Sequence, residues 1–131
     1  MTRRAAPLAA LLAALTLALT GCQSLLPVPL AGVWTGVYEH WQGGGSGVLL
    51  LDLAVSGSTV TGTWESSLPG SIARGTLSGA AQSLVMLELV TDGAPDCRFH
   101  LLAEQRRERL VGGYVADCGD VPNGWVELTR R

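Results

Sequence analysis

Apolar and polar residues alternate along most of the chain from Gly32 onward, and turn-forming residues recur about every 8 to 12 positions. No stretch of this region keeps the period of a helix over a useful length. The pattern is typical of an all-β sandwich or barrel, and it predicts eight strands. They are expected at residues 32–41, 47–56, 59–66, 71–79, 83–91, 97–104, 109–118 and 124–129.

The same alternation predicts which side chains face the interior. The expected inward sets are Trp34, Gly36 and Tyr38; Leu49, Leu51, Leu53 and Val55; Val60, Gly62 and Trp64; Ala73, Gly75 and Leu77; Val85, Leu87 and Leu89; and Val126 and Leu128. Glycines inside strands mark tight bends, and an aromatic residue two positions further along the same strand lies on the same face and can cover the gap. This combination suits a small antiparallel up-and-down β-barrel, which removes exposed sheet edges.

Two cysteines test the register of one expected hairpin. If Cys97 begins the sixth strand and Cys118 ends the seventh, a turn near Arg107 places the two cysteines opposite each other. The same register pairs Phe99 with Ala116, Leu101 with Tyr114 and Ala103 with Gly112, all on one apolar face. The opposite face then carries Arg98, His100, Glu104, Gly113 and Asp117. Cysteine spacing and hydrophobic alternation therefore predict the same register.

An even number of up-and-down strands gives the barrel two different ends. The connections after the second, fourth and sixth strands are short. Those after the first, third, fifth and seventh strands, such as "QGGGS" and "TDGAPD", are richer in Gly and Pro and are expected to form an open mouth. The first strand then starts, and the last strand ends, at the short-loop end.

The N-terminus has the residue order of an export signal. Two arginines precede an uncharged run, residues 5–19, that is too short to span a bilayer. After this run, Leu19-Thr20-Gly21-Cys22 resembles the lipobox of bacterial lipoproteins. The resemblance implies cleavage before Cys22 and acylation of that residue, with palmitate among the chains, and several acyl chains suffice for stable anchoring. An ordinary secretory signal with an incidental cysteine is the alternative.

These features divide the chain into a signal peptide at residues 1–21, a lipidated N-terminus and tether at residues 22–31, and a barrel domain at residues 32–131. The tether is short, and its prolines make it semi-rigid. The short-loop end of the domain is therefore expected to lie close to the bilayer. Arg130 and Arg131 would then lie beside anionic headgroups, with the mouth facing away. The expected location is the extracytoplasmic side of the cell membrane or outer membrane.

Composition narrows the classes of partner. Removal of residues 1–21 leaves 110 of the 131 residues, enough for one domain, and changes the formal charge from −2 to −4. A chain with this charge and no clustered basic surface is not expected to bind nucleic acid. Cys97 and Cys118 are expected to form a disulfide, which would stabilise the fold by about 3 kcal/mol in the chain-entropy model. Free thiols or a metal pair are the alternatives.

Two strand motifs resemble those of known barrels. Ala31-Gly32-Val33-Trp34 and Val60-Thr61-Gly62-Thr63-Trp64-Glu65-Ser66 are similar to the first and third strands of avidin-type barrels, and the Gly-x-Trp start is also similar to lipocalins. In the avidin pattern the first strand supplies a polar side chain to the ligand, and the matching position here is Gly36. The third-strand tyrosine of that pattern is Trp64 here, which leaves Ser66 as the matching hydroxyl. The resemblance therefore implies the fold type and not the avidin ligand.

One set of residues is expected to line a pocket at the mouth, because cavities in small barrels combine aromatic rings with a few polar groups. The set is Tyr38, His40, Trp64, Ser66 and Tyr114. The alternative is that these aromatic rings fill a narrow core. No nucleophile, base and orienting acid come together in the expected arrangement, so neither an enzyme nor a cofactor is expected.

Two surface features complete the analysis. Asp92, Asp96, Asp117 and Asp120 fall on two mouth loops, where they predict an acidic solvated rim, with a calcium site as the alternative. The outer face of the last four strands carries Leu84, Met86, Leu102, Val111, Val115 and Trp125. Such residues form either an association surface or a set of scattered exposed hydrophobic side chains.

The sequence therefore predicts a membrane-anchored, non-catalytic binding or interaction module of the cell envelope, with a small apolar or aromatic ligand at the barrel mouth. The alternative is a structural or inhibitory envelope protein. It would act through its loops or through the outer face of strands five to eight, toward a second copy of itself or another envelope protein.

Overall fold

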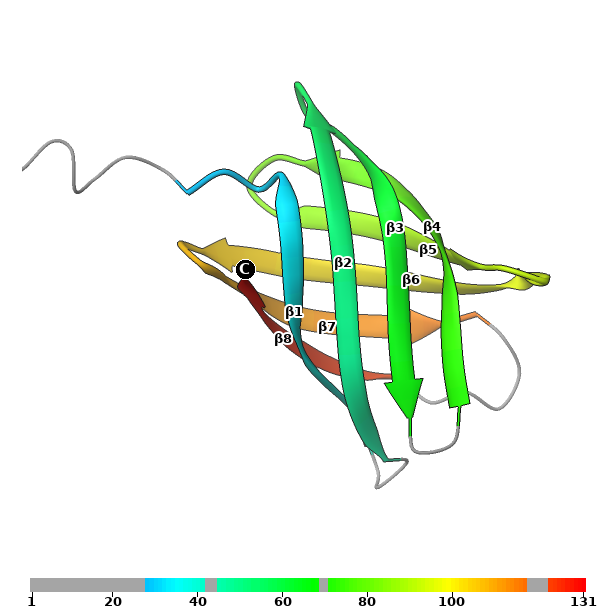
Figure 1. Cartoon of the computed structure of the whole chain (residues 1–131). Coiled ribbons are helices and arrows are strands. Elements are labelled where there is room, and N and C mark those ends of the chain that lie inside the picture. The colour runs from blue at the N-terminus through cyan, green and yellow to red at the C-terminus, as the bar shows by residue number, and fades with distance from the viewer. Residues whose placement is uncertain (1–27, 42–44, 69–70, 118–122) are drawn as a thin grey trace, which may run out of the picture.

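The computed structural model describes residues 28–41, 45–68, 71–117 and 123–131, and this part of the chain forms a closed barrel of eight antiparallel strands (Figure 1). Each strand pairs with the next one in sequence, and the last pairs with the first. The strands are β1 (Gly32–His40), β2 (Ser46–Ser56), β3 (Thr59–Leu68), β4 (Ser71–Ala81), β5 (Val85–Thr91), β6 (Ala94–Arg106), β7 (Arg109–Ala116) and β8 (Gly124–Arg130). The predicted fold class is confirmed.

The predicted register of the β6–β7 hairpin is also confirmed. Phe99 pairs with Ala116, Leu101 with Tyr114 and Ala103 with Gly112. The turn lies at Arg107, whose φ of 57° is in the left-handed region, and Glu108. Hydrophobic alternation was sufficient to set this register, because a shift by one residue would move every apolar side chain of the hairpin to the outer face.

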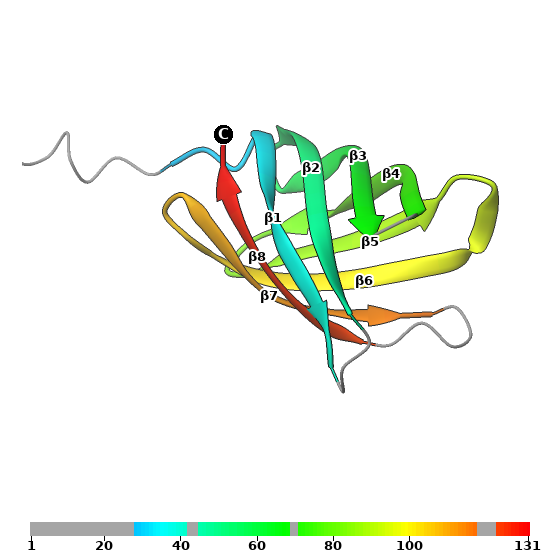
Figure 2. The ribbon, with the colours of Figure 1, turned by 60° about the horizontal axis from the view of Figure 1, so that its bottom comes forward.

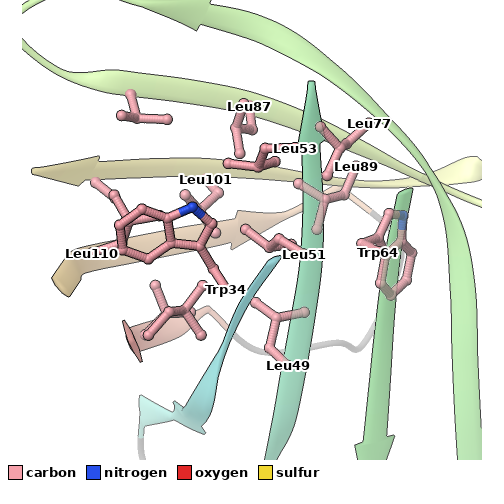
Figure 3. Packing of buried hydrophobic residues seen from close by; sticks show 14 of the residues in the cluster. Trp34, Leu49, Leu51, Leu53, Trp64, Leu77, Leu87, Leu89, Leu101 and Leu110 are labelled. Carbon is pink, nitrogen blue, oxygen red and sulfur yellow. The ribbon is translucent and has the colours of Figure 1, made fainter. Parts of the chain in front are cut away.

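Packing is densest in the half of the barrel opposite the mouth. Trp34, Leu51, Val60, Leu110 and Leu128 are almost completely removed from solvent. Figure 3 shows Trp34 beside Leu110 in this region, apart from Trp64. Leu110 was not among the residues predicted to face inward, although Leu110 lies on the same face of β7 as Gly112 and Tyr114. Val55 has the predicted inward alternation, since it pairs with the buried Val60, but it lies near the end of β2 and is 36% exposed.

The segment before β1 closes this end of the barrel. The indole Nε1 of Trp34 donates a hydrogen bond of 2.7 Å to the carbonyl of Leu30, which is itself buried. Gln105 holds the carbonyl of Val28 at 2.9 Å, and Arg130 holds that of Ala31 at 2.9 Å. The start of β1 and the end of β8 therefore lie at one end of the molecule (Figure 1).

Two details of this end correct the sequence analysis. Leu30 belongs to the core and not to a simple tether, because it packs over Trp34. Arg130 is paired with Trp34 across β1 and β8, so its side chain lies on the inner face and its guanidinium binds backbone at the closed end. Arg131 alone of this pair is exposed.

The connection between β5 and β6 is shorter than expected. Asp92 and Gly93 form a two-residue turn, with a φ of 76° at the glycine, and β6 begins at Ala94 instead of Cys97. An Asp-Gly pair favours such a tight hairpin, and this local preference outweighs the Pro and Asp residues that suggested a loop. The hairpin extends beyond the neighbouring strands (Figure 2).

Gly112 and Gly113 provide a matched test of the barrel's tightness. A Cβ on Gly112 would overlap the carbonyl oxygen of Leu102, whereas a Cβ on the outward-facing Gly113 would meet a single atom, the carbonyl oxygen of Gly124, at 3.2 Å. We expect Gly112→Ala to lower the free energy of unfolding by about 1 to 3 kcal/mol, as overpacking does. Gly113→Ala should change it by less than about 1 kcal/mol. Urea unfolding measures both, and equal effects would contradict the model of a tight interior.

Candidate functional site: a cavity at the barrel mouth

A cavity of about 260 Å³ lies in the mouth half of the barrel. It is lined by Tyr38, His40, Leu49, Trp64, Ser66, Ala73, Leu89, Thr91, Cys97, Phe99, Leu101, Tyr114 and Val126. Every strand contributes, and each contributes the half that lies toward the mouth. The interior is therefore packed at one end and hollow at the other. A filled core and a pocket, the two alternatives that the sequence left open, occur in opposite halves of the barrel.

All five residues proposed from the sequence, Tyr38, His40, Trp64, Ser66 and Tyr114, line this cavity. That they bind a ligand stays a prediction. The other lining residues were missed as site residues, although alternation had already placed several of them on the inner face. The available signal was position: an inward residue in the mouth half of any strand borders the hollow.

Five aromatic rings form a connected chain along the cavity wall. Trp64 contacts Phe99 with ring centroids 5.8 Å apart, and Phe99 contacts Tyr114 at 6.4 Å. Tyr114 in turn contacts both His40, at 5.8 Å, and Tyr38, at 6.1 Å. All these contacts are edge-to-face, an arrangement in which the positive edge of one ring meets the negative face of the next.

Three of the large aromatic residues of the wall each lie over a glycine of the neighbouring strand. Tyr38 is paired with Gly47, Trp64 with Gly75 and Tyr114 with Gly124. A Cβ at Gly47 would lie 2.6 Å from the Tyr38 hydroxyl oxygen, and one at Gly75 would lie 2.8 Å from the Trp64 indole nitrogen. From the sequence, each aromatic ring was predicted to lie over the glycine two positions earlier in its own strand. The covered glycines are instead the cross-strand partners, because strand twist carries a large inward side chain over its neighbour.

Gly124 brings together two polar side chains of the cavity wall, those of His40 and Tyr114. It pairs with His40 on one side and with Tyr114 on the other, so the three residues form one row across β1, β8 and β7. Because the central position has no side chain, the Tyr114 hydroxyl reaches the Nδ1 atom of His40, at 2.6 Å. His40 is 8% exposed. A buried polar pair at this distance holds both rings in fixed orientations.

The remaining polar groups of the wall have partners among the described residues. Trp64 donates its indole hydrogen to the carbonyl of Val90 at 3.0 Å, next to the point where the β5–β6 register shifts. The Thr91 hydroxyl donates to the carbonyl of Cys97 at 2.9 Å. The Tyr38 hydroxyl lies 3.5 Å from the carbonyl of Ser67 and also interacts with the Ser66 side chain. The His40–Tyr114 pair differs from these bonds, because either of its members can act as the donor.

The cavity disfavours charge. Among the described residues that line it there is no Arg, Asp or Glu. Burial raises the pKa of Tyr114 well above its ordinary value of 10.0, with smaller contributions from Tyr38 and Glu39. Burial also raises the pKa of Tyr38, partly offset by its hydrogen bond with Ser66. Both shifts have the direction expected when a phenol is removed from water.

The other sites proposed from the sequence are the aspartates of the mouth loops and the cysteines. Asp92, Asp96 and Asp117 are exposed, Asp120 lies outside the described residues, and in the described chain no three His, Cys, Asp or Glu side chains form a group that could hold a metal ion. Cys22 and Cys118 also lie outside the described residues, so lipidation and the disulfide with Cys97 stay predictions.

The outer face carries an apolar row. Met86 pairs with Leu102, Leu102 with Gly113, and Gly113 with Trp125, so these residues cross β5 to β8 side by side. Leu84, Met86, Leu102 and Val115 are exposed, whereas Val111 and Trp125 are half-buried. Whether this row contacts a partner stays a prediction.

The fold and the cavity define a small closed β-barrel with one hollow, aromatic-lined end. Comparison with known proteins gives no match to a family model, a curated protein or a solved structure. A search of the described residues for a helix long and apolar enough to cross a membrane finds none.

The chain's two tyrosines both line the cavity, so their titration reports on this site alone. A raised pKa means that the folded barrel retains the phenol protons to higher pH than the unfolded chain does. This contribution to stability is complete below about pH 10 and is lost as the pH rises above it. We expect tyrosinate absorbance to appear together with loss of the circular dichroism of the barrel. Tyr114→Phe should weaken the alkaline destabilisation, and normal titration of both tyrosines in a folded barrel would contradict the assignment.

Proposed function

We propose that this protein is a lipid-anchored protein of the cell envelope that holds a small apolar or aromatic ligand, without catalysis, in the mouth of its barrel. The observation that carries the proposal is the 260 Å³ cavity with its chain of five aromatic rings. Ligand sites are usually concave, mostly apolar and supplied with a few polar groups that orient the ligand. This cavity has each of those properties.

The cavity's size restricts the ligand. Its volume lies just below the range of about 300 to 1,000 Å³ that is common for ligand pockets. A compound of one or two rings therefore fits, and a long acyl chain or a large cofactor does not. Aromatic walls also suit a flat ring, because an added ring can make the same edge-to-face contacts as the side chains do.

The proposed anchor fixes the direction in which the mouth opens. Acylated Cys22 lies six peptide steps before Val28, a reach of at most about 20 Å. Val28, Leu30 and Ala31 are bound to the closed end of the barrel. A lipid on Cys22 would therefore hold the closed end near the bilayer and leave the cavity open to the aqueous side.

The cavity can be tested by filling it. Ala73 lines the wall, so Ala73→Phe places an extra ring inside. We expect the wild-type chain to increase the fluorescence of 6-propionyl-2-(dimethylamino)naphthalene, an uncharged two-ring probe that brightens in apolar surroundings, and Ala73→Phe to abolish the increase. Ala54→Phe is the matched control, because Ala54 is exposed on the outer face of β2. Thermal unfolding of each variant confirms that it is folded. Equal probe binding by both variants, or none by the wild type, would count against the proposal.

Anchoring has its own test. We expect Cys22→Ser to move the protein from the membrane fraction to the soluble fraction and to remove incorporation of labelled palmitate. Gln23→Ala, the change at the next position, should leave both unchanged. Membrane sedimentation and intact mass give the result. A Cys22→Ser variant that remains in the membrane fraction would contradict anchoring through this residue.

A further inference from the structure

The hydrogen bond between His40 and Tyr114 determines what the cavity wall can offer to a ligand. If the Tyr114 hydroxyl donates to Nδ1, the imidazole carries its hydrogen on Nε2, and the tyrosine oxygen keeps a free lone pair. If Nδ1 donates instead, Nε2 becomes an acceptor and the tyrosine hydroxyl becomes a donor. In both arrangements the pair has one donor and one acceptor left over.

A hydroxyl group matches this pair better than other simple functional groups do. A hydroxyl group can either donate or accept, so it can bind Nε2 of His40 in either tautomer. A carbonyl or ether oxygen can use the donor alone. A hydrocarbon can use neither, and its presence would leave the remaining hydrogen-bonding capacity of two buried side chains without a partner.

The cavity also selects against charge. No Arg, Asp or Glu occurs among the described lining residues, so a carboxylate or an amine would lose its hydration without gaining a fixed counter-charge. The walls disfavour even the ionised form of their own tyrosines. These observations favour an uncharged ligand.

We propose that the ligand is an uncharged aromatic alcohol or phenol whose hydroxyl group binds one member of the His40–Tyr114 pair while its ring contacts the aromatic wall. This inference rests on the proposed function and adds the chemical class of the ligand. It depends on the geometry of the row formed by His40, Gly124 and Tyr114.

Three probes of one shape test the inference: naphthalene, 2-naphthol and 2-naphthoate. They differ in carrying no polar group, a hydroxyl, or an anionic carboxylate. Isothermal titration of the purified chain should show 2-naphthol binding about threefold to tenfold more tightly than naphthalene, as one net hydrogen bond predicts. 2-Naphthoate should bind more weakly than naphthalene.

The double variant His40→Leu with Tyr114→Phe removes both members of the pair and leaves no unpaired partner behind. It should bind naphthalene more tightly than the wild type does, because the hydrocarbon no longer covers buried polar groups, and its preference for 2-naphthol should fall to about onefold. His100→Leu is the matched control, because His100 is exposed on the outer face of β6, and it should keep the wild-type preference.

The outcomes separate the two proposals. Equal binding of naphthalene and 2-naphthol by the wild type, tightest binding of 2-naphthoate, or a preference that persists in a folded double variant would each overturn the inference and leave the ligand cavity itself standing. Failure of all three probes to bind would overturn the proposed function together with the inference. The wild-type series alone decides the matter if the double variant does not fold.

Discussion

The absence of side chains at three inward positions decides where this barrel is packed and where it is hollow. A closed sheet of eight strands has an interior just wide enough for side chains to fill it. At Gly47, Gly75 and Gly124, each opposite Tyr38, Trp64 or Tyr114, a Cβ would meet the ring of its partner. The rings therefore lie against the wall instead of crossing the centre. The space that they would have occupied becomes the cavity.

The closed end makes this hollow tolerable. An empty or water-filled cavity loses contacts that a packed core would have, so the stability of the barrel must come from elsewhere. Trp34, Leu110 and Leu128 supply a dense apolar layer, and Arg130 and Trp34 bind the segment 28–31 across the opening. Through these contacts β1 and β8 are both joined to residues 28–31, the segment that precedes β1. One end of the molecule is thus tightly packed, and the other end contains the cavity.

Hydrophobic alternation was sufficient to predict the strands, the closed barrel and the β6–β7 register. The reason is that burial of one face decides which alternate residues of each strand point inward. Alternation also placed Tyr38, Trp64 and Tyr114 on the wall of one cavity. It did not reveal that Gly124 lets His40 reach Tyr114, because that contact depends on the pairing of β1 with β8, which lies at the other end of the sequence. Loop composition was the least reliable guide: the Asp92-Gly93 turn and the burial of Leu30 depend on local turn geometry and on tertiary packing.

Selectivity in such a cavity arises as much from rejection as from attraction. The aromatic walls would accept many small apolar compounds with similar affinity, because dispersion and edge-to-face contacts discriminate poorly among rings of similar size. The His40–Tyr114 pair changes this, since a bound compound that cannot hydrogen-bond covers buried polar groups and leaves them without water. A site built around a hydrogen bond can reject the analogue that lacks it far more strongly than an apolar pocket can reject a change in size. If the proposed ligand class is correct, this buried pair would give a largely apolar hollow its chemical specificity.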